Sequence, residues 1–514
     1  MGPQGLEKIS TLAQLPPEFR VRPPVSILEG QVGWEKSGKT SLRAKVAVKE
    51  GPRVSIDMLS SAEAINVRQL LIEDETSKAS ASFSLGRKEF RLDFKGQLKK
   101  TTLDRLLLKN ELLIGSISGD FGANILIDQP LGSTAHGRIQ GTGLHYHLPV
   151  PVKLPIVLES VALDVKGRKV NVDAGLSAPE DRHMRLAGDV DLSGKEILVD
   201  MNLTTDGIHW KKVETAVKEE EKTSPPGKGE KRKLPPVSGI LRVRSDYLAY
   251  GKYSVKPFHA DVSFSGDDVS VAVREANLCG ISTPGTVKIT PQEVGLKFNP
   301  ASRAMELAPT LHCMFGEKRQ ATGIFDLKGE ITARGKPEEL VQSLKGNFEF
   351  NGKKGHIFQD PVLLKIFALL NVGEIFIGQP TDLGKEGFGY KSINIKGNLQ
   401  NGKLLLEEAV LDGPSMGVIA KGEIDLINET IDLSVFVAPL KTLDRIVKYI
   451  PILGHVLGGS LIAIPLRVKG NLNDPEVTPL DPAMIGEDLF GIVKRTLGLP
   501  FNIIQPLFPG KKKE

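Results

Sequence analysis

Residues 90–98 read Phe-Arg-Leu-Asp-Phe-Lys-Gly-Gln-Leu, and this stretch decides the fold. Apolar residues stand at every second position and alternate with charged or polar ones, which is the period of a β-strand with one dry and one wet face. The same alternation returns at 42–48 and at 431–437. The sequence therefore predicts a protein built mainly from amphipathic strands.

A five-residue unit, apolar-x-Gly-x-apolar, recurs in the same phase along the chain. Its glycine always takes an inward position of the predicted strand. Glycine inside a strand usually marks a bend, a bulge or a close approach of another backbone, so a sheet made of these units should curve around its dry face. The glycines of the seven units are Gly96, Gly188, Gly329, Gly346, Gly397, Gly422 and Gly470.

The arrangement of the strands follows from their spacing. About 8–12 residues per strand and turn favour an antiparallel, meandering sheet, and Asn401-Gly402 is a strong hairpin signal. Because an open sheet rarely exceeds about ten strands without curling or splitting, the dry faces either pack on each other as sandwiches or form one long open groove. We favour a long, curved antiparallel β-sheet forming an open groove, with a few short α-helices near the C-terminus. Candidate lining residues are Phe90, Leu92, Phe94, Val418, Ile424, Leu433 and Val435.

Helices are few in this interpretation, and one segment interrupts the strands. Residues 214–236 carry charge and proline without an apolar period, which indicates a linker or loop. We therefore divide the chain into an N-terminal groove segment (1–213), a central one (237–334) and a C-terminal region (335–514). Short helices are predicted at 103–109, 337–344, 360–371, 442–450 and 482–497.

Composition and motifs argue against an enzyme. The 514 residues include 67 Lys and Arg against 62 Asp and Glu, interleaved along the chain, which does not favour nucleic-acid binding. Gly33 to Thr40 fits the nucleotide-binding loop pattern but leads into a strand rather than the helix this site requires, and Gly413 to Gly417, which contains Ser415, fails as a nucleophile elbow for the same reason. His145 and His147 lack a third metal ligand at a suitable spacing. We expect no catalytic residue, cofactor, nucleotide or metal.

The last third of the chain resembles the C-terminal region of the AsmA-like proteins, the group that includes AsmA, TamB and YhdP of Gram-negative envelopes. The resemblance rests on the order Pro-x-x-Gly, Gly-Gly, Ile-Pro-x-x-Val-x-Gly, Asp-Pro between residues 451 and 475, preceded by 355–370 and 437–444. Its signature residues, which are structural, are Pro451, Gly454, Gly458, Gly459, Pro465, Gly470 and Pro475.

This resemblance implies a periplasmic groove protein that shields phospholipid acyl chains during transport between the inner and outer membranes and so maintains the envelope. It implies contact with a membrane surface or an envelope protein through the C-terminal region, and an oxidising compartment that favours a Cys279–Cys313 disulfide over two buried thiols. The alternative is a non-enzymatic outer-membrane assembly or structural factor built of β-sandwiches.

The resemblance also implies an N-terminal transmembrane anchor, associated with the inner membrane. No apolar run of that kind precedes the first predicted strand. We interpret this as a truncated or mis-started reading frame, or as a partner that docks elsewhere, and we do not expect this polypeptide itself to be anchored.

Overall fold

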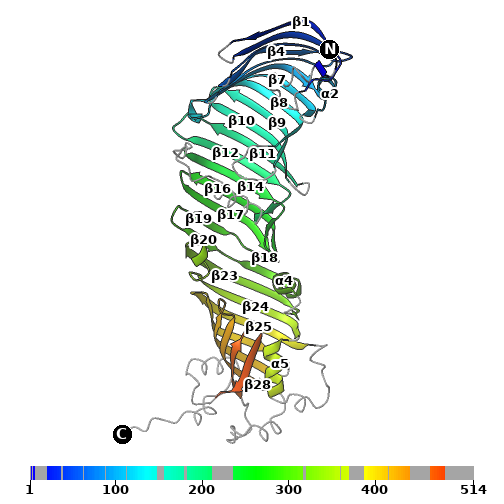
Figure 1. The fold of residues 1–514 in the computed structure, drawn as a ribbon. Helices are drawn as coiled ribbons and strands as arrows, with labels where there is room; N and C mark the ends of the chain where they lie inside the picture. Colours follow the sequence, from blue (N-terminus) through cyan, green and yellow to red (C-terminus); the bar gives the residue numbers. More distant parts are fainter. Residues whose placement is uncertain are drawn as a thin grey trace, which may run out of the picture. The chain divides into compact units, whose positions relative to one another are not determined.

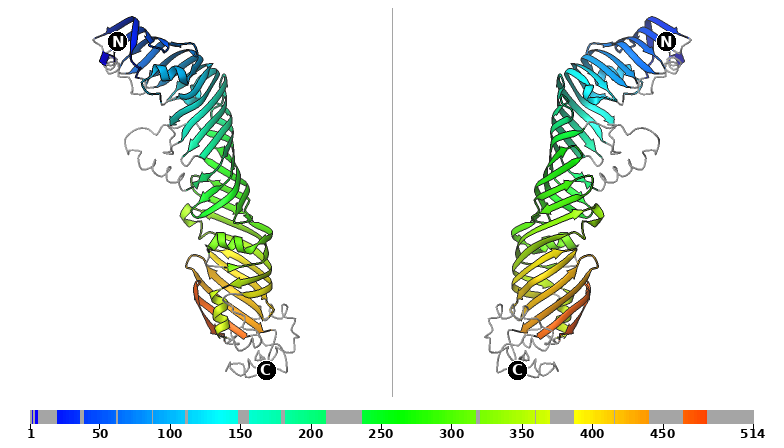
Figure 2. Two further views of the ribbon diagram at one scale, coloured as in Figure 1. Left: turned by 90° about the vertical axis from the view of Figure 1, so that its right-hand side faces the viewer. Right: turned by 90° about the vertical axis from the view of Figure 1, so that its left-hand side faces the viewer.

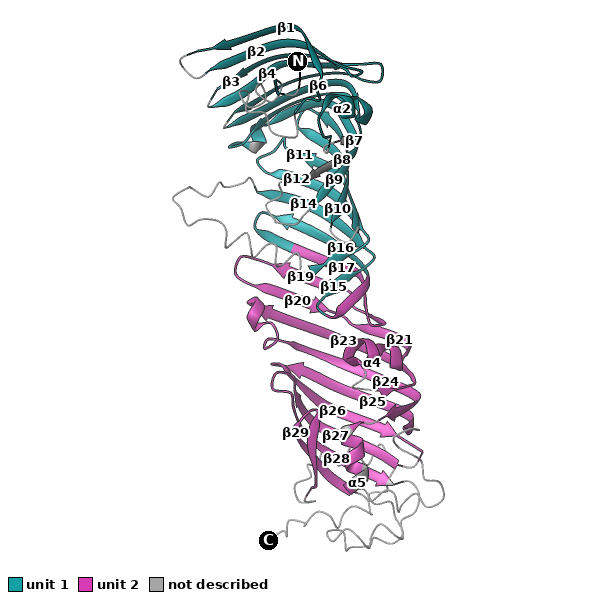
Figure 3. Ribbon diagram, turned by 45° about the vertical axis from the view of Figure 1, so that its right-hand side comes forward, with its two compact units in different colours: residues 1–251, 257–269 teal, residues 252–256, 270–514 magenta. Residues whose placement is uncertain are grey.

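The strands dominate the computed structural model of the chain. Among the described residues, thirty strands belong to one mixed β-sheet, which confirms the prediction of a mainly β protein. They fall into two compact units (Figure 3): unit 1 contains Met1–Gly251 and Pro257–Val269, and unit 2 contains Lys252–Lys256 and Ser270–Glu514. The structure describes residues 2, 4–5, 20–35, 39–61, 63–86, 88–110, 113–147, 156–178, 182–210, 236–316, 320–358, 360–369, 387–414, 416–439 and 464–480.

Unit 1 is a layer of strands that follow one another in chain order (Figure 1). Most neighbours are antiparallel hairpin partners, but β12 and β14 pair in parallel. Helix α2 (Lys100–Leu106) and the short 3-10 turn η2 (Pro130–Gly132) accompany the strands. The strands are β1 (Val25–Trp34), β2 (Thr40–Val48), β3 (Arg53–Ser60), β4 (Ala64–Glu73), β5 (Lys78–Gly86), β6 (Glu89–Lys99), β7 (Leu113–Leu126), β8 (Thr134–His147), β9 (Val157–Lys166), β10 (Lys169–Ala178), β11 (Arg182–Asp191), β12 (Ile197–Thr205), β13 (Ile208–His209), β14 (Val237–Ser245), β15 (Leu248–Tyr250) and most of β16 (Tyr253–Ser265).

Inward glycines of unit 1 bring neighbouring backbones close together, as the sequence pattern indicates. Gly96 of β6 has a φ of 119°, and a Cβ placed there would lie 2.1 Å from the carbonyl oxygen of Lys78. Gly239 of β14 has a φ of 124°, and its Cβ would lie 1.9 Å from the Val199 carbonyl oxygen. Only glycine fits such positions without moving the partner strand.

Unit 2 continues the same design with shorter strands at first and longer ones later. Its strands are again hydrogen-bonded to one another in one sheet and are coloured green to red in Figure 2. Helices α4 (Leu307–Phe315) and α5 (Pro361–Leu369) and the 3-10 turn η4 (Pro337–Glu339) join them. The strands are β17 (Asp268–Leu278), β18 (Ile281–Ser282), β19 (Gly285–Ile289), β20 (Val294–Phe298), β21 (Ala301–Glu306), β22 (Gln320–Ala321), β23 (Ile324–Gly335), β24 (Lys345–Phe358), β25 (Phe388–Gln400), β26 (Lys403–Asp412), β27 (Met416–Asp425), β28 (Thr430–Pro439), β29 (Ile464–Asn471) and β30 (Asp474–Pro479).

Helix α5 begins where its sequence predicts a helix start. The Asp360 Oδ1 atom accepts hydrogen bonds from the backbone N–H groups of Val362 (3.0 Å) and Leu363 (3.1 Å), and Pro361 occupies the first turn. This side-chain cap satisfies N–H groups that the helix itself leaves unpaired. The cap fixes the point at which the chain leaves β24 and turns into the helix.

The other helix predictions meet different outcomes. The predicted helix at 103–109 begins and ends three residues earlier, as α2, and the one at 337–344 is reduced to the 3-10 turn η4. Helix α4 was not predicted, and it lies before the C-terminal region, to which we assigned most of the helices. The predictions at 442–450 and 482–497 fall outside the described residues. So does the predicted linker, except Pro236, and the predicted domain boundaries stay a prediction.

Candidate functional site

The inward side of unit 1, which we call the apolar face, is the candidate site. Two rows of directly opposed residues cross it from β2 to β16, and both contain only apolar residues and glycine. The central row is Val46, Val54, Ile72, Ala79, Gly96, Gly119, Ile139, Leu163, Val172, Gly188, Met201, Leu241 and Val262. The second row is Ala44, Ile56, Leu70, Ala81, Phe94, Phe121, Gly137, Val165, Val170, Val190, Val199, Gly239 and Phe264.

The apolar face is covered only in part. Phe90, Leu92 and Phe94, predicted as lining, all lie on this face of β6, and each side chain keeps part of its exposure. Leu163 of β9 and Val172 of β10 are likewise half-buried. Side chains sealed between two packed layers would lose nearly all their contact with solvent. The partial exposure indicates that this stretch of the face remains accessible to an apolar ligand.

Helix α2 covers one end of the apolar face. Its Leu103 and Leu106 side chains are buried in a cluster with Val48 and Val54. Its Thr102 is fully buried, and its hydroxyl lies 2.6 Å from the Ser77 hydroxyl oxygen. The helix therefore closes the face around β2 and β3.

The opposite face of unit 1 is charged, and its charges pair across the strands. Lys95 contacts Asp120 directly across β6 and β7 at 2.6 Å. Arg185 donates to both carboxylate oxygens of Asp173, at 2.9 and 2.7 Å, and these hydrogen bonds hold the pKa of Asp173 below its ordinary value. Ion pairs of this kind are exposed and contribute little stability, but they keep this face in water. Alternation thus leaves the other face for apolar contacts.

The C-terminal lining candidates lie in a different setting. Val418, Leu433 and Val435 face inward on β27 and β28 as predicted, but they are 8%, 7% and 2% exposed within a buried core. Ile424 packs against the same cluster. These residues are core side chains rather than an open lining, because α5 covers them.

Helix α5 closes this part of unit 2. Ile366 of the helix is 1% exposed inside the cluster. Lys365 holds the helix to the β29–β30 hairpin, since its Nζ donates to the carbonyl oxygen of Pro475 at 2.8 Å and pairs with Asp474. The sheet around β25–β30 is therefore filled by its own helix.

Helix α4 covers another part of the inward side of unit 2. Its Leu307 is buried with Phe325 and Ile281. A disulfide joins Cys313 of the helix to Cys279, which follows β17. The Thr310 hydroxyl also donates to the Cys279 carbonyl oxygen at 2.9 Å. The helix is thus attached to the sheet by a covalent bond and by packing.

The signature residues are only partly placed. Pro465 lies buried in β29. Gly470 of the same strand stands opposite Pro475 of β30, and Pro475 is buried as well. They shape the last hairpin, on which α5 rests. The other four signature residues, Pro451, Gly454, Gly458 and Gly459, fall outside the described residues.

Motifs that resemble catalytic sites sit on strands and turns. The nucleotide-binding pattern at 33–40 spans the β1–β2 hairpin, in which Trp34 opposes Thr40 and the Glu35 N–H donates to the Lys39 carbonyl oxygen at 2.9 Å. His145 and His147 lie in β8, and no group of three metal-ligating side chains occurs among the described residues. Ser415 is not described.

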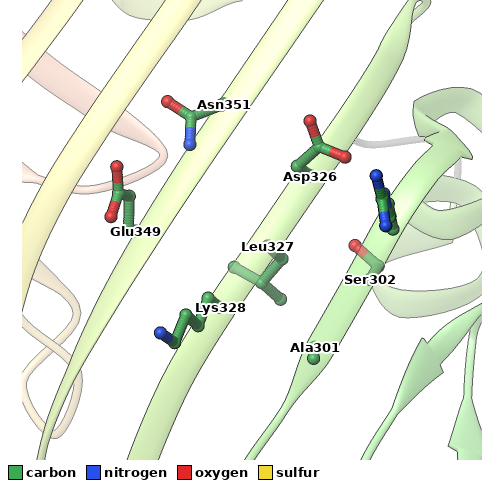
Figure 4. Close-up of a pocket in the computed structure, with 8 residues that line it drawn as sticks. Ala301, Ser302, Asp326, Leu327, Lys328, Glu349 and Asn351 are labelled. Atoms are coloured by element: carbon green, nitrogen blue, oxygen red, sulfur yellow. The ribbon is translucent and has the colours of Figure 1, made fainter.

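A hollow of about 500 Å³ lies on the polar side of unit 2 (Figure 4). Asp326 and Lys328 line it and alternate along β23 with Leu327, whose side chain belongs to the inward phase. Glu349 and Asn351 of β24 complete the polar wall. The hollow is wide open and mixed in charge, so it offers no enclosed site.

The sequence reasoning missed much of the apolar face. Beyond β6, Gly188 was the only member of the two rows singled out as inward, although Leu163, Val172, Met201 and Leu241 continue the central row. Alternation within each strand was available as a signal. What was missing was the register, which decides which residues of successive strands stand opposite each other.

Comparison with known proteins gives one match. Residues 320–477 match the family model described as YhdP protein, and no curated protein or solved structure shows significant similarity to the chain. None of the described helices combines the length and hydropathy that crossing a membrane requires. The predicted resemblance is therefore confirmed for this region: residues 320–477 match the YhdP family, a member of the AsmA/TamB/YhdP-type group of envelope proteins.

Proposed function

We propose that the chain is a periplasmic carrier that shields phospholipid acyl chains on its apolar face during transport between the inner and outer membranes. The observation that carries this proposal is the pair of unbroken apolar rows from β2 to β16. The family match over residues 320–477 supports it at the level of envelope proteins. Through this transport the protein would help to maintain the envelope of a Gram-negative cell.

The binding energy would come from the hydrophobic effect. Removing one CH₂ group from water contributes about 0.8 kcal/mol, and partly exposed side chains such as Leu163 and Val172 still have apolar surface to cover. Because the two rows carry no charge, an acyl chain would find similar contacts at successive strands. Affinity spread in this way permits movement along the face and needs no covalent chemistry, so we propose a non-enzymatic protein.

The headgroup would remain in water at the edge of the sheet. Charged groups lose much free energy when they leave water unpaired, so a headgroup would not follow the chains onto the apolar rows. The C-terminal region, which the family match overlaps, is our proposed contact with a membrane surface or an envelope protein. Its dense core around Leu466 and Val468 would keep that end rigid.

Site-specific photocrosslinking tests the proposal. A photoreactive residue at Leu163 should crosslink phospholipid in intact cells, whereas the same residue at Asp164, on the polar face of the same strand, should not. Val172→Asp should reduce the phospholipid that co-purifies with the protein, and Asn171→Asp, the matched change on the polar face, should not. Equal crosslinking from both faces, or lipid-free protein from gentle extraction, would contradict the carrier.

The same experiment separates the rival function. An assembly factor built of closed sandwiches would bury the β6 side chains completely, whereas Leu92 and Phe94 keep part of their exposure. If Leu163 captured outer-membrane proteins and no lipid, the assembly function would replace the carrier.

A further inference from the structure

The turn between β9 and β10 places a cation at the edge of the apolar face, next to the second apolar row. Val165 and Val170 are opposed members of that row on either side of the turn. Arg168 lies in the turn itself, one residue before β10 begins, beyond the last apolar pair of this hairpin. The side chain is half-buried, and its backbone oxygen accepts the Leu192 N–H at 2.9 Å.

Part of the Arg168 guanidinium is buried without a partner. Its Nε atom has no hydrogen-bond partner among the described residues. Nearby carboxylates are engaged by other cations: Asp191 pairs with Lys169 at 3.3 Å, and Asp164 pairs with Arg138. A buried donor that belongs to a charged group costs stability until an acceptor reaches it. This position therefore favours an anion supplied from outside the chain.

The neighbouring Lys166 offers a natural comparison. It carries the same charge in the same turn, but it follows Val165 directly and therefore belongs to the polar phase. It is exposed. A ligand drawn to the protein by charge alone would respond to both residues, whereas a ligand lying on the apolar face would respond to Arg168.

We propose that Arg168 forms a discrete phosphate site at the edge of the apolar face, which holds the headgroup of an amphiphile whose acyl chain lies on the apolar rows at β9 and β10, beside Val165 and Val170. The proposal rests on the carrier function above. A guanidinium suits this role because its planar donors match phosphate oxygens in a bidentate arrangement. Acyl chains would then pause at this strand pair instead of binding equally along the face.

Calorimetry with three probes and the purified full chain tests the site. The probes are inorganic phosphate and two amphiphiles, dodecyl phosphate and uncharged monolaurin, the amphiphiles being kept below their critical micelle concentrations. Arg168→Gln should weaken dodecyl phosphate binding by about fivefold, the order expected for loss of a charge-assisted hydrogen bond at a partly exposed site. It should leave monolaurin binding unchanged. Lys166→Gln should change neither, and Arg168→Lys should restore part of the loss. Circular dichroism of each variant checks the fold.

The outcomes are distinct. Equal weakening by Arg168→Gln and Lys166→Gln, or no weakening by either, would overturn the phosphate site. Failure of the wild-type protein to bind monolaurin would instead overturn the carrier function on which the site rests. If inorganic phosphate binds as tightly as dodecyl phosphate and responds equally to Arg168→Gln, the phosphate site stands but free phosphate, rather than a headgroup, is its ligand.

Discussion

The two units use the same strand pattern and bury it to different degrees. On β6 of unit 1, Leu92 and Phe94 keep part of their exposure, whereas Val435 of β28 and Leu466 of β29 in unit 2 are 2% and 1% exposed. The difference comes from α5, which inserts Ile366 over the unit 2 strands. Alternation therefore predicts the inward side of a strand, and a separate element decides whether that side stays open.

Removing the disulfide of unit 2 should have the largest effect on stability. The described residues of unit 1 contain no disulfide. The double variant Cys279→Ser, Cys313→Ser removes a cross-link between residues that lie 34 positions apart in the sequence. We expect the free energy of unfolding of unit 2 to fall by about 4 kcal/mol, from the gain in entropy of the unfolded chain. Hydrogen exchange measured by mass spectrometry on α4 and β23 would report the loss. Both tryptophans, Trp34 and Trp210, belong to unit 1, so their unfolding transition should not move; a shift there would break the comparison.

Matched leucine truncations probe the difference in burial directly. Leu466→Ala should cost about 3 kcal/mol, because it leaves a cavity in a closed core. Leu92→Ala should cost about 1 kcal/mol, because water already reaches part of this side chain. Urea unfolding followed by hydrogen exchange at β29 and β6 gives both values. Equal costs would show that the two inward sides are equally closed.

A third prediction tests the inward glycines, which both units share. Gly96→Ala places a Cβ against the Lys78 carbonyl oxygen at a φ of 119°, and we expect a loss of about 2 kcal/mol or more from backbone strain. Gly295→Ala in β20 is the control, because a Cβ there meets nothing within 4 Å. Thermal unfolding of the two variants measures the effect. Similar midpoints would argue against a steric role for Gly96.

The smallest expected effect on stability concerns the ion pairs of the polar faces. These pairs should contribute similarly in the two units. Arg467 donates hydrogen bonds of 3.0 and 2.8 Å to Asp432 and holds the pKa of this carboxyl below its ordinary value. A pKa lowered by folding stabilises the protein above the unfolded-state pKa, about 3.9, and this contribution is lost as the pH falls through the folded-state pKa.

Asp432→Asn should therefore lower the free energy of unfolding by less than about 1 kcal/mol at pH 7, because the pair is partly exposed. The difference from wild type should shrink as the pH falls below about 4. Asp173→Asn should behave alike in unit 1, where Arg185 lowers the pKa of that carboxyl. Urea unfolding between pH 2 and 7 gives both curves, and a large effect in one unit alone would contradict the equivalence.

Local sequence patterns predicted the strands. They did not predict elements whose position depends on contacts between residues that are distant in the chain. The alternation at 90–98 corresponds to β6, and Asn401-Gly402 forms the β25–β26 turn, with φ values of 53° and 75°. These features depend on neighbours in the chain. Helix α4 was missed because its nine residues give a weak periodic signal, and its position depends on packing against Phe325.

The candidate site was predicted in the same uneven way. Phe90, Leu92 and Phe94 lie on a partly exposed face, but Val418 and Val435, with the same alternation, are buried beneath α5. Their sequences do not differ in a way that reveals the covering helix. The parallel pairing of β12 with β14 was equally invisible, because strand direction depends on how the connecting segment returns and not on either strand.

The hairpin-by-hairpin pairing of unit 1 has a consequence for how the protein comes apart. Each strand from β2 to β11 is hydrogen-bonded to strands adjacent to it in sequence, so cooperativity should decay with distance along the array, as it does in repeat proteins. Melting would then proceed in stages, and no single midpoint would describe the chain. A local opening of a few strands would let a bulky ligand enter while the remaining strands stay folded.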